Sequence, residues 1–324
     1  MSPGSGGAGA GGDAVLEVRG LSRAFEKVRA VDDLSFAVER GRIHGFLGPN
    51  GAGKTTTMRL IATLDIPDAG DAIVDGLSVL EEPQAVRARL GFMADHFAPY
   101  PDLDVRGYLD FFAHAYGLRG RERARRVASA AAFCGLVDLY DRPATGLSKG
   151  MGQRLHLAKT LLHDPPLLLL DEPASGLDPR ARIELRELLR ELAAAGKGIL
   201  ISSHILTELA EIVDSVVLIE AGRLILAGTT GEVARKVREH HRVRVRVLEA
   251  AAERAERFLL TQPAVREVRV ADPSALDFDF GGDDAGLSEL LKRAVEAGLP
   301  IVSFSPEEAD LEEVFLRSTQ GRLQ

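Results

Sequence analysis

The chain is organised around the stretch Arg42-Ile43-His44-Gly45-Phe46-Leu47-Gly48-Pro49-Asn50-Gly51-Ala52-Gly53-Lys54-Thr55-Thr56-Thr57-Met58. The apolar run from Ile43 to Leu47 predicts a buried strand, and the residues from Thr55 onward predict the start of a helix. Between them lies a glycine-rich loop with the spacing Gly-x-x-x-x-Gly-Lys-Thr. A strand, a glycine loop and a helix in this order favour a phosphate site over a chance match of the pattern.

The residue types of this loop suit an anion. Glycines let successive backbone N–H groups turn inward, and a helix start adds unpaired N–H groups and the positive end of its dipole. Lys54 is expected to reach the β- and γ-phosphates, and the Thr55 hydroxyl to bind Mg²⁺ with support from Thr56. The predicted nucleotide-binding residues are Gly48, Pro49, Asn50, Gly51, Ala52, Gly53, Lys54, Thr55 and Thr56.

A second segment completes a metal–nucleotide site. Four leucines, Leu167 to Leu170, predict a central parallel strand that is covered on both faces. Asp171 follows this strand and is expected to hold the metal, while Glu172 can orient or deprotonate an attacking water. His204 ends the strand that begins at Gly198, and parallel strands place ligands at such ends. A single histidine is usually structural, but this one can hydrogen-bond a γ-phosphate.

Two further features have open interpretations when taken alone. Ser148 stands at a predicted helix start with Gly150 just inside it, which is either an anion site or an ordinary capped helix. Phe25 lies between two predicted strands, where an aromatic ring can stack on adenine or form a small core contact.

Composition excludes several classes of protein. The chain has 324 residues, 45% of them hydrophobic and 27% charged, as in an ordinary globular protein. No run approaches 18 apolar residues, so we expect no membrane span. The single cysteine, Cys134, excludes an internal disulfide and fits a reducing cytosol. A net charge of −8 argues against nucleic acid as the main partner.

The order of elements predicts an α/β fold with a largely parallel sheet. Alternating strands at 14–25 and 31–39 form an antiparallel β subdomain, and residues from about 83 to 165 form a helical insertion rather than a continuation of the sheet. We expect a disordered tail at 1–13, a nucleotide-binding domain at 14–236, and a ferredoxin-like α+β domain at 237–324. The strand with Arg242, Arg244 and Arg246 is either a solvated face or a surface for acidic lipid or protein.

Taken together, these segments resemble the ATP-binding cassette (ABC) ATPases, which have a P-loop NTPase core with an antiparallel β subdomain and a helical insertion. The resemblance covers residues 15–228 and rests on the joint order of Phe25, the phosphate loop, the Asp95 loop, Leu147 to Gln153, Asp171-Glu172, Ser175 to Asp178 and His204. It implies the cofactors ATP and Mg²⁺. It also implies that two domains pair head to tail, with each ATP gripped by the phosphate loop of one subunit and the signature residues of the other.

The roles that follow from this resemblance are assigned by position. Glu172 is the general base, His204 contacts the γ-phosphate, and Phe25 stacks on adenine. The signature residues acting in trans are Ser148, Lys149 and Gly150, Asp178 lies at the dimer seam, and the metal ligands are Thr55, Asp171 and Asp95. Two motifs depart from the family pattern: Asp95 stands where glutamine is usual, and the signature from Leu147 to Met151 reads Leu-Ser-Lys-Gly-Met where Leu-Ser-Gly-Gly-Gln is common.

The end of the chain is similar to the C-terminal domain of exporter-type cassettes such as the daunorubicin-resistance subunits, from Ser305 to Phe315 in particular. The resemblance therefore implies an ATPase that powers export through ATP-driven dimer closure. It implies a cytoplasmic, peripheral location on the inner face of the membrane. The implied partners are a separately encoded transmembrane permease, docked near the Asp95–Val105 loop, and a second ATPase subunit that forms a homodimer.

Two other functions are considered. A soluble cassette protein that acts on the ribosome or on DNA usually has two cassettes or a long coiled coil, and neither is predicted here. A P-loop kinase or unrelated NTPase leaves Ser148 to Gln153 and Ser203-His204 unexplained.

Overall fold

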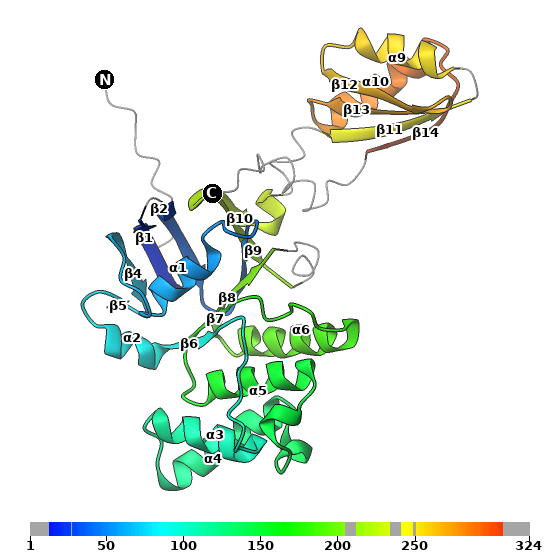
Figure 1. Ribbon diagram of the computed structural model, residues 1–324. Coiled ribbons are helices and arrows are strands. Elements are labelled where there is room, and N and C mark those ends of the chain that lie inside the picture. The colour runs from blue at the N-terminus through cyan, green and yellow to red at the C-terminus, as the bar shows by residue number, and fades with distance from the viewer. Residues whose placement is uncertain (1–12, 27, 205–211, 234–240, 249–250, 307–324) are drawn as a thin grey trace, which may run out of the picture. The chain divides into compact units, whose positions relative to one another are not determined.

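The structure is a computed structural model that describes residues 13–26, 28–204, 212–233, 241–248 and 251–306 (Figure 1). It forms two compact units, one running to Gly228 and the other beginning at Thr229. The predicted domain boundary at residues 236 and 237 and the predicted helix at 311–318 lie outside the described residues, as does most of the predicted helix at 205–212.

The first unit is built on a six-stranded sheet with the order β10-β9-β3-β8-β7-β6. Strand β3 pairs in parallel with β8 and β9, and β7 pairs in parallel with β6 and β8. The bounds are β3 Ile43–Leu47, β6 Leu90–Met93, β7 Leu167–Leu170, β8 Gly198–Ser203, β9 Ser215–Glu220 and β10 Arg223–Thr229. Because β3, β7 and β8 are buried at every residue, the predicted central parallel sheet is confirmed.

A smaller antiparallel sheet with the order β2-β1-β4-β5 lies beside it. Its strands are β1 Ala14–Phe25, β2 Val28–Glu39, β4 Ala69–Val74 and β5 Leu77–Ser78. Helix α1 (Lys54–Ile61) buries Met58, Leu60 and Ile61 in the core that the two sheets share. In the same core Phe36 stacks on Phe46, with the ring centroids 5.4 Å apart. The phosphate loop therefore enters a helix that is fixed between two sheets.

Helices make up most of the remainder of this unit: α2 Pro83–Arg89, α3 Val105–Ala115, α4 Gly120–Phe133, α5 Lys149–Leu161 and α6 Pro179–Ala194. One prediction was wrong here. Strand β6 was assigned to the helical insertion, but it pairs in parallel with β7 at the edge of the central sheet. A four-residue strand between a helix and a proline-rich loop has too little periodicity to indicate its sheet.

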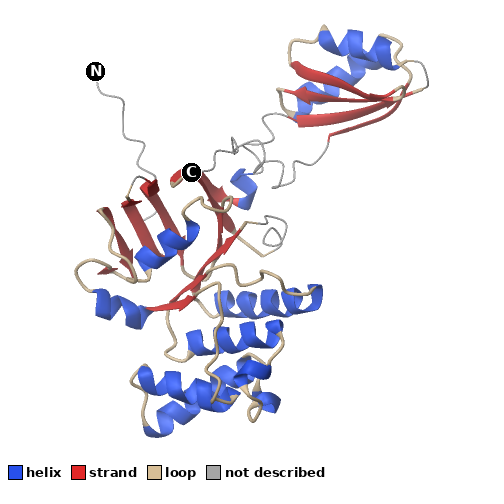
Figure 2. Cartoon of the chain, in the orientation of Figure 1, coloured by secondary structure: helices blue, strands red, loops and turns tan. Residues whose placement is uncertain are grey.

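The second unit follows the order β-α-β-β-α-β, with β11 His241–Val247, α9 Ala252–Leu260, β12 Val265–Asp272, β13 Ala275–Phe280, α10 Asp284–Glu296 and β14 Ile301–Pro306. Its sheet order is β12-β13-β11-β14, and both helices cover one face (Figure 2). On the strand predicted to be basic, Arg244 makes two hydrogen bonds to Asp277, of 2.8 and 3.1 Å. This pairing favours the solvated-face interpretation of that strand.

Candidate functional site

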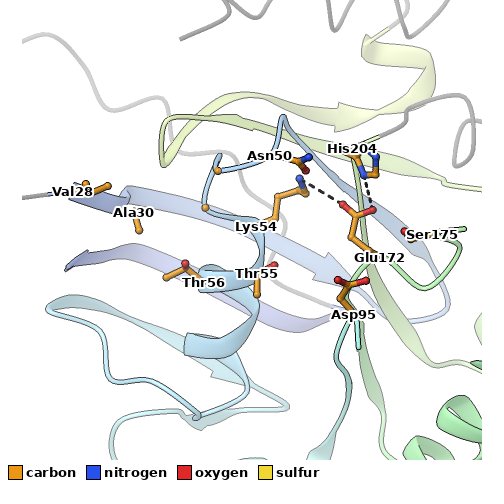
Figure 3. A pocket seen from close by; sticks show the side chains of 12 residues that line it. Val28, Ala30, Asn50, Lys54, Thr55, Thr56, Asp95, Glu172, Ser175 and His204 are labelled. Carbon is orange, nitrogen blue, oxygen red and sulfur yellow. Dashed lines mark hydrogen bonds and ion pairs between the residues drawn. The ribbon is translucent and has the colours of Figure 1, made fainter. Parts of the chain in front are cut away.

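A pocket of about 510 Å³ opens beside the phosphate loop of the first unit (Figure 3). It draws residues from β2, from the loop before α1 and from the ends of β6, β7 and β8. Its lining consists of Val28, Ala30, Asn50, Gly51, Gly53, Lys54, Thr55, Thr56, Asp95, Glu172, Ser175 and His204. Segments that lie far apart in the sequence thus meet at the carboxyl ends of parallel strands, where such folds bind ligands.

The phosphate loop is fixed by its backbone. Gly53 has a positive φ of 102°, and a Cβ atom placed on it would lie 2.2 Å from the carbonyl oxygen of Ala30. No side chain fits there, so the loop and β2 touch directly. The loop ends at the start of α1, where unpaired N–H groups and the helix dipole attract an anion.

Lys54 is the buried cation of the pocket, with 6% of its surface exposed. Its Nζ donates hydrogen bonds to the carbonyl oxygens of Gly48 at 2.7 Å and Pro49 at 3.2 Å, and lies 3.7 Å from Oε1 of Glu172. Burial lowers the pKa of Lys54, and the nearby carboxylates of Glu172 and Asp171 oppose that shift. The ammonium group can therefore exchange these oxygens for phosphate oxygens with little rearrangement.

Asp171 is the most buried acid of the site, at 1% exposure. Its Oδ2 accepts a hydrogen bond from Thr55 Oγ1 at 2.8 Å, and its Oδ1 accepts one from Ser202 Oγ at 2.6 Å. Oxygen donors are what Mg²⁺ prefers, and it usually takes few protein ligands together with phosphates and water. No group of three His, Cys, Asp or Glu side chains within the described ranges is placed to hold a metal without such help. Thr55 and Asp171 offer such oxygens and Asp95 lines the same pocket, so these three residues would be the protein ligands of Mg²⁺.

Glu172 stands next in the chain, in an unusual backbone conformation with a φ of 49°. Its N–H donates to Ser202 Oγ at 2.9 Å, and its Oε2 lies 2.8 Å from Nδ1 of His204. One carboxylate thus faces Lys54 and His204 together (Figure 3). Strained backbone of this kind is costly and is often kept at functional sites, because it aims a side chain.

The other predicted site residues lie in different places. Gly48, Pro49 and Ala52 belong to the same loop, although they do not line the pocket. Phe25 is also absent from the lining. The residue is 44% exposed, which argues against a core contact, and the Arg23 guanidinium lies 4.8 Å from the ring centroid.

The predicted signature and seam residues also stand apart from the pocket of their own chain. Ser148 caps α5 by accepting a hydrogen bond from the Met151 N–H at 3.3 Å. Asp178 caps α6 by accepting one from the Ala181 N–H at 3.0 Å. The exposed Lys149 side chain lies across Gly176, in the turn before α6.

Two features of the site are not predicted from the sequence. Val28 and Ala30 form an apolar wall, and Ser202 joins Asp171 to the backbone of Glu172. The alternation along β2 signals a sheet face but does not show that this face meets a ligand. Ser202 lies at the carboxyl end of β8, and this position is the one feature of the sequence that could have indicated a role in the site.

Within the described residues, no helix is both long and apolar enough to cross a membrane.

Comparison with known proteins adds the family. A family model described as ABC transporter matches residues 31–175. The daunorubicin/doxorubicin resistance ATP-binding protein DrrA of Streptomyces peucetius is 36% identical over 311 residues, which cover 94% of this chain and 92% of that protein. The Nod factor export ATP-binding protein I of Ralstonia nicotianae is 34% identical over 316 residues, covering 97% and 96%. The solved structure of an ATP-binding subunit of an ABC transporter is 33% identical, with a TM-score of 0.63, and covers 69% of this chain and 93% of its own.

Proposed function

The chain belongs to the ABC transporter family of ATP-binding subunits and hydrolyses ATP, and from this premise we propose that it powers an exporter in the cell membrane. The similarity to DrrA and to the Nod factor export subunit extends over both units of the chain. That similarity carries the export part of the proposal, and the carboxylate of Glu172, set between Lys54 and His204 beside a phosphate loop, carries the ATP hydrolysis.

The proposed chemistry follows from these contacts. Lys54 leaves the carbonyl oxygens of its own loop and binds the phosphates of ATP. Glu172 then accepts a proton from the attacking water, and His204 holds the carboxylate in position and contacts the γ-phosphate. Thr55, Asp171 and Asp95 would hold Mg²⁺, which neutralises charge that develops on the phosphates.

We propose that the pocket is completed by a second copy of the chain. Ser148, Lys149 and Gly150 do not line the pocket of their own chain, and both Ser148 and Lys149 are exposed. At the start of α5 they present helix N–H groups and an ammonium group to an incoming anion. ATP then favours the closed pair because it touches both subunits, whereas ADP lacks the γ-phosphate contacts and lets them separate.

The proposed docking surface for the permease lies on the loop after Asp95 and on α3. Tyr100 packs against Phe111 and Phe112, with centroid distances of 5.7 and 6.3 Å. Tyr100 and Phe111 are each 50% exposed, which is unusual for large aromatic rings and typical of interface anchors. The loop begins at the predicted metal ligand, so movement of the docked permease and occupancy of the pocket are coupled through one segment.

Co-expression with a candidate permease tests this proposal. We expect the full chain to be recovered with membranes, with ATPase activity that the permease changes, and both effects to be lost in Tyr100→Ala with Phe111→Ala. ATP binding by that double variant should remain as in the wild type. Recovery with ribosomes after nuclease treatment, and no response to the permease, would instead support the soluble alternative.

A further inference from the structure

The apolar wall of the pocket continues into a charged cluster. Val28 and Ala30 of β2 line the pocket, across from Glu172 and His204 (Figure 3). The pairing of β2 with β1 shifts register between Arg29 and Val31, so the strand is irregular where it leaves the pocket. Asp32 lies two residues beyond Ala30 in the same strand.

Asp32 is held by two arginines. Its Oδ1 accepts a hydrogen bond from Arg29 Nη1 at 2.7 Å, and its Oδ2 accepts one from Arg223 Nε at 2.6 Å. The aspartate side chain is only 11% exposed, whereas both arginine side chains are mostly exposed. Arg223 opens β10 and lies 191 residues away in the sequence, so this cluster joins β2 to the turn between β9 and β10.

The backbone at this junction also includes the phosphate loop. The Asp32 N–H donates to the Gly222 carbonyl oxygen at 2.9 Å, and the Gly222 N–H donates to the Ala52 carbonyl oxygen at 3.0 Å. Cβ atoms placed on Gly53 and Gly222 would lie 2.2 and 2.8 Å from the carbonyl oxygen of Ala30. Three segments thus touch without intervening side chains, and a shift of one displaces the others.

We propose that Asp32, clamped by Arg29 and Arg223, is a positioning residue that sets nucleotide affinity by fixing the apolar wall against the phosphate loop. The wall is built of aliphatic groups, so it fits the base or sugar of the nucleotide rather than its phosphates. This inference rests on the proposed function only in that the pocket must bind ATP. Asp32 itself does not line the pocket and acts through Val28 and Ala30.

The substitution Asp32→Asn tests the clamp because the clamp and simple electrostatics predict opposite changes in ATP affinity. Removing a negative charge near the pocket should by itself strengthen the binding of anionic ATP. Loss of the clamp should instead weaken it, by about 5- to 20-fold, the range expected when a charge-assisted hydrogen-bond cluster is broken. ATP and ADP should lose affinity equally, since the wall is remote from the γ-phosphate, and kcat at saturation should stay within about twofold of the wild type.

A matched control is available in the same β subdomain. Asp75, in the turn between β4 and β5, also faces two arginines: it accepts a hydrogen bond from Arg40 and forms an ion pair with Arg89, and it does not line the pocket. Asp75→Asn therefore removes the same charge from the same kind of cluster. We expect it to leave the ATP dissociation constant unchanged, and we expect Asp32→Glu to recover part of the lost affinity.

The measurement is titration of the full chain with a fluorescent ATP analogue, competed with ATP and ADP. If Asp32→Asn is poorly folded, Arg223→Gln at a mostly exposed position breaks the same clamp. Because this variant removes a positive charge, it is compared with Arg40→Gln, which removes the same charge from the Asp75 cluster, and only Arg223→Gln should lose affinity. Unchanged or tighter binding in the folded variants, or an equal loss in Asp75→Asn, would overturn the inference. Failure of the wild type to bind ATP, or normal binding by Lys54→Ala, would instead overturn the proposed function.

Discussion

Two sides of the first unit differ in how completely their buried polar atoms are hydrogen-bonded. One side carries the phosphate loop, and the other carries α5, the signature helix that begins beside Ser148. Near the start of β3, the strand that leads into the phosphate loop, the buried His44 has both ring nitrogens engaged, since Nε2 accepts from the Glu39 N–H at 3.0 Å and Nδ1 lies 2.6 Å from Ser215 Oγ. On α5, the equally buried His156 has no described hydrogen-bond partner for Nδ1, and Gln153 has none for Oε1. Burying a polar atom without a partner costs free energy.

This difference bears on the proposal that two chains share each site. The phosphate loop, Asp171 and Glu172 are fixed in position by hydrogen bonds within the chain. On the other side, Ser148 and Lys149 are exposed, and Phe97 of the Asp95 loop packs on His156, with a centroid distance of 5.5 Å. The signature helix is therefore the side that can adjust, whereas the phosphate loop is the side that is set in advance.

The largest expected effect is a loss of kcat on the phosphate-loop side. Glu172→Gln keeps the shape of the side chain and its contact with His204 but removes the proton acceptor. We expect kcat to fall by roughly 10²- to 10⁴-fold, the usual contribution of a general base, with ATP affinity near that of the wild type. Phosphate release in the purified chain measures this, with Glu122→Gln on the exposed face of α4 as the control. Normal turnover by the Glu172 variant would remove this residue from its proposed role.

Lys54→Ala should come next, because it removes the cation but leaves the carboxylates of Asp171 and Glu172 facing the phosphates. Charge-assisted hydrogen bonds contribute about 1.5–3 kcal/mol, so the dissociation constant for ATP should rise roughly 10- to 150-fold. Calorimetric titration gives this value directly. Lys197→Ala, which removes a lysine that pairs with Asp164 away from the pocket, should bind ATP normally. An unchanged affinity in Lys54→Ala would contradict the phosphate-loop assignment.

The sequence predicts which segments meet on the phosphate-loop side. The structure brings Gly53, Lys54, Glu172 and His204 to one pocket because each follows a short apolar strand, and parallel strands bring such ends to one edge. Their roles stay predictions. The assignment of β6 failed, and the wall formed by Val28 and Ala30 was missed. The pairing of Asp32 with Arg223 depends on contacts across 191 residues, and no local pattern records such contacts.

A smaller effect is expected on the adjustable side. Ser148→Ala removes a helix cap, worth about 1 kcal/mol, and also the proposed contact with the partner's ATP. Asp104→Ala is the matched control, because Asp104 caps α3 through the Gly107 N–H at 2.6 Å and is remote from the pocket. Both variants should lose similar thermal stability, and only Ser148→Ala should lose ATP-dependent dimerisation in a Glu172→Gln background. Light scattering after gel filtration measures the dimer, and equal dimerisation by the two variants would contradict the in-trans role.

The effect that bears least on ATP binding and turnover is on the pH dependence of stability. Burial lowers the pKa of His44 to about 4 and that of His156 to about 3, while both titrate near 6.5 when the chain is unfolded. Between pH 6.5 and about 4 the unfolded chain therefore binds more protons than the folded one, so stability falls as the pH is lowered, by about 1.4 kcal/mol per pH unit for each histidine. Urea unfolding of the first unit at several pH values measures this slope.

The two histidines can be separated by His156→Phe, which keeps a ring against Phe97 and has no nitrogen to leave unpaired. We expect this variant to lose the contribution of one histidine to the pH dependence of the unfolding free energy. At pH 7 it should be as stable as the wild type or more stable, because the unpaired nitrogen is removed. His44→Phe should lose the same share of the slope, yet it should be less stable at pH 7, because it breaks two hydrogen bonds. If both variants were equally destabilised at pH 7, the buried polar atoms of the two sides would be equally well hydrogen-bonded. The distinction between a phosphate-loop side that is fixed in advance and a signature-helix side that can adjust would then fail.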